Sequence, residues 1–226
     1  MAGIEIIVPV LNEEAILPEQ LHRLKAISDA HLLFVDGGSS DRSTQLLDRA
    51  GVCWISSKPG RAGQMNAGAR HCNSDVLVFL HADTVFEPRH LQAIRQVMQN
   101  EEIVAGRFDI HLSGSHPAFR LIEFMINLRS RLTKISTGDQ AMFVRHSAFE
   151  AAGGFPEQPL MEDIEISKRL RQLGEIACLG ERVMTSSRRW EVHGIARTVW
   201  LMWWLRLRYW LGADPDALKK HYLDQT

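Results

Sequence analysis

The sequence predicts an α/β fold with a mostly parallel central sheet and helices on both of its faces. Short apolar, β-rich runs alternate with helical patterns through the first hundred residues, as expected of βαβ units. Polar, glycine-rich segments follow the ends of these runs. Because ligands of open α/β sheets bind outside the carboxyl ends of the strands, these segments are predicted to form one site.

The elements are expected in the following order. Ile4 to Val10 is an apolar run of strand length, and Glu13 to Ile27 spaces its apolar residues as a helix does, with Asn12 as a candidate N-cap. The other expected strands are 32–35, 52–55, 76–80, 103–110 and 141–144, and the other expected helices are 41–50, 62–71, 116–132, 161–173 and 195–211. With no repeat, low-complexity segment or linker, we predict one domain over residues 1–226, whose segment 195–226 is a helical, Trp-rich tail packed on it or used as an interface.

Composition excludes several classes of protein. A formal net charge of −1 gives no overall attraction to nucleic acid. Cys53, Cys72 and Cys178 are odd in number and far apart, which favours a reducing cytosol over a disulfide framework. The N-terminus lacks the basic start of a signal peptide, and no apolar run is long enough to span a membrane. We therefore expect a cytoplasmic protein, with peripheral contact at the inner face of the membrane as a further option.

The segment DGGSSD, residues 36–41, follows the second expected strand. Asp36 could accept hydrogen bonds from a ribose or a base edge, and the glycines would allow another backbone to approach. The segment could equally be a plain turn in which Asp41 caps the next helix. The residues alone leave both interpretations open.

The segment HADT, residues 81–84, ends the most apolar run. Carboxylates suit Mg²⁺ and Mn²⁺, which are often shared with substrate phosphates. Asp83 could hold such an ion, and His81 could be a ligand or support the turn. Alternatively, Asp83 is a capping residue beside a histidine at the strand end.

Two further segments open helices. GRAGQMNAGAR, residues 60–70, offers a helix start suited to phosphate, or is a solvated amphipathic helix. Glu162 and Asp163 open a later helix, where acidic residues stabilise the helix dipole. The functional alternative is that Asp163 is a general base and Glu162 its neighbour or a contact of the acceptor hydroxyl.

In this order, the segments IIVPVLNEE, FVDGGSSD, HADT and GGFPEQPLMEDIEISKRL resemble glycosyltransferase family 2, nucleotide-sugar enzymes with the GT-A fold. The resemblance runs from about Ile4 to about Trp190. TGDQAMFVRHSAFEAAGGF and FLHADT also resemble a bacterial subgroup of short, single-domain members, some of which are labelled arsenosugar-biosynthesis transferases.

The resemblance implies a metal-dependent, inverting transfer of a sugar from a nucleotide-diphosphate sugar to a hydroxyl of a small-molecule or lipid-linked acceptor. It implies that Asp163 is the catalytic base, with Glu162 beside it, and that Asp83 holds Mn²⁺ or Mg²⁺. His193 could be a second metal ligand or an ordinary surface histidine. The implied contacts to the nucleotide sugar are Pro9, Asn12, Glu13, Asp36, Arg61, Asn66, His81, Asp83, Arg188 and Arg189, and those on the acceptor side are Gly138, Asp139 and Gln140.

Three departures from the family pattern matter. His81 stands where the family carries the first acid of Asp-x-Asp, which would weaken metal binding or favour Mn²⁺. Gly37 replaces the second Asp of V-D-D-G and leaves Asp36 alone to contact the nucleoside. Ser186 stands where processive members carry Gln, so we expect a single, non-processive transfer.

The sequence leaves two alternative functions to compare with this one. A nucleotidyltransferase would want a basic, glycine-rich loop after its first strand, whereas this chain has the acidic LNEEA. The incomplete Asp-x-Asp keeps open a non-catalytic, sugar-nucleotide-binding relative. Glu162, Asp163, Arg61 and Asn66 argue for the enzyme.

The Trp-rich segment from Thr198 to Leu211 places its largest apolar residues on one helical face. These residues are Trp200, Trp203, Trp204, Leu207 and Leu211. The face could pack on the domain as core, pair with a second subunit, or lie in a membrane interface, where Trp and Arg are favoured.

Overall fold

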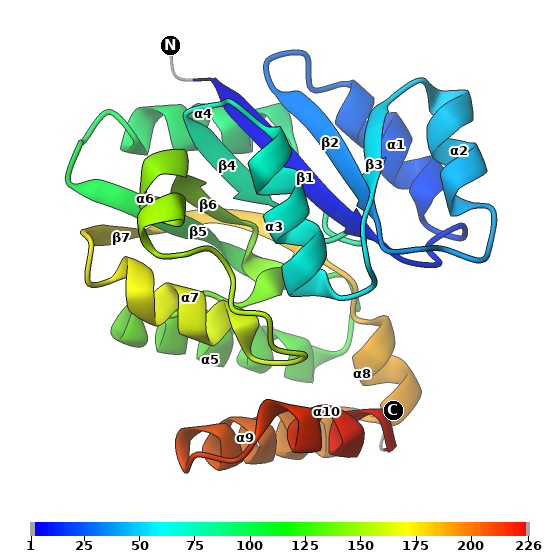
Figure 1. Cartoon of the computed structure of the whole chain (residues 1–226). Coiled ribbons are helices and arrows are strands. Elements are labelled where there is room, and N and C mark those ends of the chain that lie inside the picture. Colours follow the sequence, from blue (N-terminus) through cyan, green and yellow to red (C-terminus); the bar gives the residue numbers. More distant parts are fainter. Residues whose placement is uncertain (1–2, 225–226) are drawn as a thin grey trace.

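A computed structural model describes residues 3–224, with side chains described as far as Tyr222 (Figure 1). The strands are β1 (Ile4–Val10), β2 (His31–Asp36), β3 (Cys53–Ser56), β4 (Val76–Phe79), β5 (Ile103–Leu112), β6 (Met142–Arg145) and β7 (Glu175–Thr185). The helices are α1 (Leu17–Lys25), α2 (Ser43–Ala50), α3 (Arg61–His71), α4 (Pro88–Val97), α5 (Pro117–Thr133), α6 (His146–Ala151), α7 (Glu162–Leu170), α8 (Arg188–His193), α9 (Ile195–Trp210) and α10 (Pro215–Asp224), with a short 3₁₀ turn, η1 (Gly138–Gln140).

The seven strands form one sheet in the order β3-β2-β1-β4-β6-β5-β7. All neighbouring pairs are parallel except those of β6, which runs antiparallel to both β4 and β5. The predicted fold class, a mostly parallel sheet, is confirmed. The prediction missed β7, because this strand is mostly half-buried or exposed and carries the polar stretch Gly180-Glu181-Arg182 in its middle.

Two apolar layers cover the two faces of the sheet. On one face, alternate residues of β1 such as Val8 pack with Leu21 of α1, Leu47 of α2 and Ile94 of α4. On the other face, α3, α6 and α7 pack against Ile7 and its neighbours. The strands alternate their side chains between these layers, so both faces of β1 and β4 are buried.

Helix α5 buries polar side chains and exposes apolar ones. Its buried face carries Glu123, Asn127 and Ser130, while apolar side chains on its other face point to solvent. The cause lies in β5, which pairs with β6 only at Ala105 and Gly106. Beyond that point the α5 side chains complete the edge: the Asn127 amide bonds both the N–H and the C=O of Ile110, and Glu123 accepts the N–H of Leu112.

Replacing Asn127 by Leu should therefore destabilise the protein by about 2–4 kcal/mol, since two buried backbone groups lose their partners. Leu128→Gln, one residue further on the exposed face, is the matched control and should change stability by no more than about 0.5 kcal/mol. Urea unfolding measures both. Equal effects of the two substitutions would show that the polar face of α5 does not support β5.

The C-terminal helices pack through a different face from the one that carries most of the tryptophans. Leu201 and Leu205 of α9 are buried against Met161 and Ile164. The predicted face is largely open: Trp200 is 60% exposed, Trp203 64%, Leu207 55% and Leu211 65%, and Trp204 is half-buried. The interpretation of this face as core is therefore wrong for these four residues. Within residues 3–224, no helix combines the length and apolarity that crossing a bilayer requires.

Candidate active site

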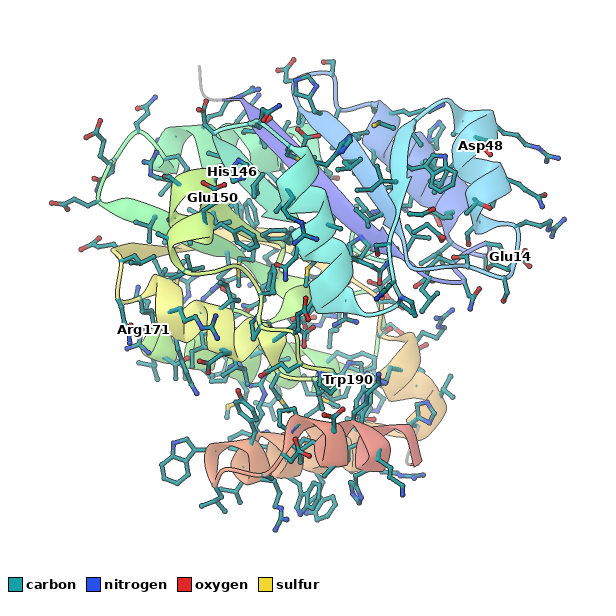
Figure 2. All side chains as sticks on the ribbon, viewed as in Figure 1. Glu14, Asp48, His146, Glu150, Arg171 and Trp190 are labelled. Carbon is teal, nitrogen blue, oxygen red and sulfur yellow. The ribbon has the colours of Figure 1, made fainter. Side chains whose placement is uncertain are left out.

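The loops after β1 and β2 form one unit at the carboxyl edge of the sheet, where Figure 2 labels Glu14. The N–H of Asn12 donates to Ser39 Oγ (2.9 Å), and Asn12 Oδ1 accepts the N–H of Ser40 (2.8 Å). Asn12 adopts a left-handed backbone with φ of 56°. The expectation that it caps α1 is wrong, since α1 begins at Leu17 and Asn12 instead joins the two loops.

Asp36 is almost completely buried, and its carboxylate accepts the N–H groups of Gly38 and Ser39. It therefore shapes the loop, and a contact with base or ribose stays a prediction. The side chain of Gln64 accounts for the glycine that follows Asp36. Its amide donates to the carbonyls of Val10 and Val35 near the ends of β1 and β2. A Cβ on Gly37 would lie only 2.9 Å from the Gln64 side chain. Pro9 lies within β1, opposite Val35.

Carboxylates of three segments act on one another at this edge. Burial raises the pKa of Glu13, and the negative charge of Asp83 raises it further. Asp83 reaches solvent, yet partial burial by its surroundings raises its pKa, and Asp139 adds to the effect. Arg61 and Arg188 oppose both shifts. The carboxylates are thus crowded, with one buried oxygen, Asp139 Oδ1, that has no hydrogen-bond partner.

His81 is enclosed beside the η1 turn. Burial, with a contribution from Arg61, holds the pKa of His81 well below its usual range, so the imidazole is neutral. Its Nε2 is buried without a partner. A Cβ on Gly138 would lie 2.3 Å from this nitrogen, so a larger residue there would force the imidazole or the η1 turn to move.

Replacing Gly138 by Ala is accordingly expected to push His81 and the η1 turn apart, lowering turnover about 10- to 100-fold, with an overpacking cost of about 1–3 kcal/mol. Gly180→Ala is the control, because its Cβ would meet nothing closer than 3.8 Å. Steady-state kinetics and thermal unfolding test both variants. Wild-type turnover in Gly138→Ala would contradict the role of this close contact.

Asp163 is the most perturbed carboxyl group of the site. Burial, together with the neighbouring charge of Glu162, raises the pKa of Asp163 to about 7, although Arg61 and two backbone N–H groups lower it. Those N–H groups belong to Gly138 (3.1 Å to Oδ2) and Ile164 (2.8 Å to Oδ1). A carboxylate held in place with a pKa near 7 is suited to general base catalysis.

Arg61 is the cation at the centre of the site. It begins α3, and its Nη1 lies 3.9 Å from Oε1 of the buried Glu162. Its charge acts on the pKa values of Glu13, Asp83 and Asp163. This one side chain therefore links the acidic edge to the predicted base.

Sequence reasoning missed Arg129. Arg129 lies on α5, and burial lowers its pKa while the charges of Asp139 and Asp163 raise it. Its Nε and Nη2 are buried without hydrogen-bond partners. No motif surrounds Arg129 in the sequence, and only the inward-facing polar side of α5 could have pointed to it.

Two other predicted residues, Asn66 and Gln140, bond to neighbouring loops. Asn66 bonds the N–H and C=O of Phe155 with its amide, so it holds the Gly-Gly-Phe turn, and its nucleotide contact stays a prediction. Gln140 is fully buried and bonded to Thr137, so it shapes η1 from inside and leaves Gly138 and Asp139 as candidates for the acceptor side.

The α8 helix brings two more cations to the site. Arg188 is exposed and acts on the pKa values of Glu13 and Asp83, whereas Arg189 is half-buried and lies over the ring of Tyr222, 4.3 Å from its centroid. Figure 2 labels Trp190, the next residue of this helix in the sequence. His193 ends α8, and its role as a metal ligand stays a prediction.

The oxygen atoms of these carboxylates suit a hard divalent cation that takes its remaining ligands from a bound phosphate and from water. The described residues contain no group of three or more His, Cys, Asp or Glu side chains that could hold an ion by themselves. The crowded carboxylates of Asp83 and Glu13 and the unpartnered Asp139 Oδ1 are nevertheless oxygen ligands of the kind that Mg²⁺ and Mn²⁺ use, with phosphate oxygens and waters in the other positions.

The sheet order and the loops at its carboxyl edge define a GT-A glycosyltransferase fold, which the solved structures support. A Pyrobaculum calidifontis mannosyltransferase, solved with GDP-Man and Mn²⁺, matches with a TM-score of 0.65 and 17% identity over 81% of this chain and 56% of its own. The Mycobacterium tuberculosis glucosyl-3-phosphoglycerate synthase, solved with Mn²⁺, UDP and glucosyl-3-phosphoglycerate, matches with a TM-score of 0.59 and 18% identity over 80% and 70%.

Sequence comparison identifies the family. The model of glycosyl transferase family 2 matches residues 5–153, and the chain belongs to this family. The Bacillus subtilis protein "Probable glycosyltransferase YdaM" is 23% identical over 96% of this chain and 56% of its own length. The undecaprenyl-phosphate 4-deoxy-4-formamido-L-arabinose transferase of Pseudomonas fluorescens is 33% identical over 39% of this chain and 30% of its own. The chain thus spans about half or less of these relatives.

Proposed function

We propose that the chain is a metal-dependent, inverting glycosyltransferase that moves one sugar from a nucleotide-diphosphate sugar to a hydroxyl acceptor. The observation that carries the proposal is Asp163, a half-buried carboxyl group whose pKa is raised to about 7. The charge of Arg61 acts both on Asp163 and on Asp83 at the acidic edge. A base and a diphosphate-binding edge in one site are what such a transfer needs.

The reaction uses the groups in a simple order. The acceptor hydroxyl donates its proton to Asp163, and its oxygen bonds to the anomeric carbon from the face opposite the diphosphate. The bond from that carbon to the phosphate oxygen breaks, and its electron pair leaves with the nucleoside diphosphate. Inversion follows because one displacement occurs.

Arginines surround the place where the leaving charge develops. Arg61 and Arg188 act on the carboxylates of this edge, and Arg189 lies within electrostatic reach of Arg61. The charge of these arginines would stabilise the departing diphosphate. A bound Mn²⁺ or Mg²⁺, held through Asp83 with Glu13 or Asp139 nearby, would supply further positive charge there. Neutral His81 in place of an acid makes this a weaker ion site than one built on two carboxylates.

The acceptor is proposed to be a small molecule or a lipid-linked hydroxyl compound. The undecaprenyl-phosphate transferases among the relatives support the lipid-linked option. Gly138, Asp139 and the unpartnered nitrogens of Arg129 would face it, next to the base. The segment with Ser186 before α8 supports single transfer rather than polymer synthesis.

The test is release of nucleoside diphosphate from a panel of nucleotide sugars with candidate acceptors, followed by NMR of the product. The proposal expects acceptor-dependent release from one donor class and an anomeric configuration opposite to that of the donor. Retention of configuration would contradict the mechanism. Tight nucleotide binding without any turnover would favour a non-catalytic, nucleotide-binding role.

A further inference from the structure

Exposed apolar side chains gather on one part of the molecule. Within the described residues, the exposed large hydrophobic side chains lie on α5, α8 and α9 with its C-cap, apart from Leu11 and Leu173. Both α5 and α9 lie below the sheet in the view of Figure 1. We name as the apolar face the exposed residues of these two helices, which are Leu121, Phe124, Met125, Leu128, Leu132, Trp200, Trp203, Leu207, Trp210 and Leu211.

The α5 part of this face is a continuous stripe that the fold holds toward solvent. Its residues recur at i, i+3, i+4, i+7 and i+11 from Leu121, so they form one continuous stripe. The opposite side of α5 is bound to β5 through Asn127 and Glu123. Because those contacts hold the helix in its orientation, the stripe stays outside, where soluble monomers rarely expose contiguous apolar surface.

The charge of helix α9 is one-sided. Helix α9 carries Arg197, Arg206 and Arg208 and no acidic residue. Helix α5 adds little to this charge, because Arg120 is paired with Glu123, Arg131 is paired with Asp109, and Arg129 is turned toward the candidate site. The whole chain has a net charge of only −1, so the arginines of α9 concentrate positive charge beside the α9 part of the apolar face.

We propose that the apolar face binds the interface of a bilayer containing anionic phospholipids. Tryptophan and arginine around an apolar stripe are the composition of helices that lie in such an interface, and the arginines complement anionic headgroups. A second copy of the chain fits less well, because a two-fold pairing would bring the same arginines against one another.

The position of the face relative to the site gives the contact a use. Helix α5 carries both the exposed stripe and Arg129, whose guanidinium acts on Asp163. Helix α9 follows directly after α8, which carries Arg188 and Arg189. Docking through these helices would hold the site next to the membrane surface. The inference does not depend on the proposed transfer, since vesicle binding requires no donor.

The test is co-sedimentation of the full chain with neutral phosphatidylcholine vesicles and with vesicles that also contain phosphatidylglycerol. The account expects binding that prefers the anionic vesicles and weakens with salt. Phe124→Gln with Trp203→Gln should lower the partition coefficient by about tenfold or more, because two apolar side chains are lost from the interface. Arg206→Gln with Arg208→Gln should remove most of the preference for anionic vesicles.

Leu173→Gln is the matched control, since Leu173 is 44% exposed and lies outside the face. It should bind vesicles as the wild type does, and the thermal midpoints of all variants in buffer should agree. Absence of binding to either vesicle would overturn the inference. So would light scattering that shows a dimer which the Phe124 and Trp203 substitutions dissociate, because the face would then join two copies.

Discussion

Asp163→Asn should lower kcat by about 10²–10⁴-fold while leaving donor affinity within about threefold. The amide keeps the shape of the side chain but cannot take the acceptor proton. In the wild type, activity should rise with pH through about 7 and then level, because the base works only when Asp163 is ionised and its pKa is raised to about 7. Steady-state kinetics with one donor, measured over a range of pH, test this rise in activity.

The same substitution should stabilise the protein at high pH. A carboxyl whose pKa rises from 3.8 to about 7 on folding lowers stability as it ionises, so the penalty is absent at low pH, grows above 3.8 and is complete above about 7. Asp163→Asn removes it, with a gain of about 1–3 kcal/mol at pH 8 and little gain near pH 4. Glu165→Gln, on the same helix, is the control. Equal stability changes at both pH values would contradict a raised pKa.

Asp83→Asn should abolish the dependence of donor affinity on Mn²⁺. Burial and the charge of Asp139 raise the pKa of Asp83, and the charge of Asp83 in turn helps to raise the pKa of Glu13, so a cation there would be bound to crowded oxygens. With Mn²⁺ present, donor affinity should fall by about 10- to 100-fold. Without Mn²⁺, the variant should bind the donor as well as the wild type or better, because one negative charge no longer repels the diphosphate.

Asp75→Asn is the matched control for this experiment. Asp75 lies just before the other end of β4, where its carboxylate accepts the N–H of Gly3. It should leave the Mn²⁺ dependence intact. Calorimetric titration with and without Mn²⁺ separates the two variants, and an unchanged Mn²⁺ effect in Asp83→Asn would remove Asp83 from the ion site.

The parts of the fold that the sequence predicts are those encoded locally. The apolar run of β4 and the loop behind it are recognisable because a buried parallel strand is apolar on both faces and must end in polar residues. Strand β7 escaped prediction because it lies at the sheet edge and carries polar residues along with its apolar ones. Its pairing with β5 depends on a partner more than sixty residues away in the chain.

The candidate site could be proposed from the sequence where one segment carries a motif, but not where distant segments meet. Asp83 and Asp163 stand in recognisable motifs, whereas Arg129 becomes part of the site only because α5 turns its polar side inward. Periodicity shows that a helix has an apolar face but not which way that face points. The apolar stripe of α5 points outward because the polar side of the helix bonds backbone groups of β5 that β6 leaves without a strand partner. No local sequence pattern reveals that arrangement.

The central claim is that the carboxyl edge of the sheet binds a nucleotide-diphosphate sugar with a divalent cation. Thermal unfolding of the wild type against nucleoside diphosphates and their sugars, with and without Mn²⁺, tests it most directly. At about 100 times its dissociation constant, the right ligand should raise the midpoint by roughly 5–10 °C. The account predicts such a shift, dependent on Mn²⁺ and confined to one base. No shift with any nucleotide, in the presence or absence of Mn²⁺, would contradict it.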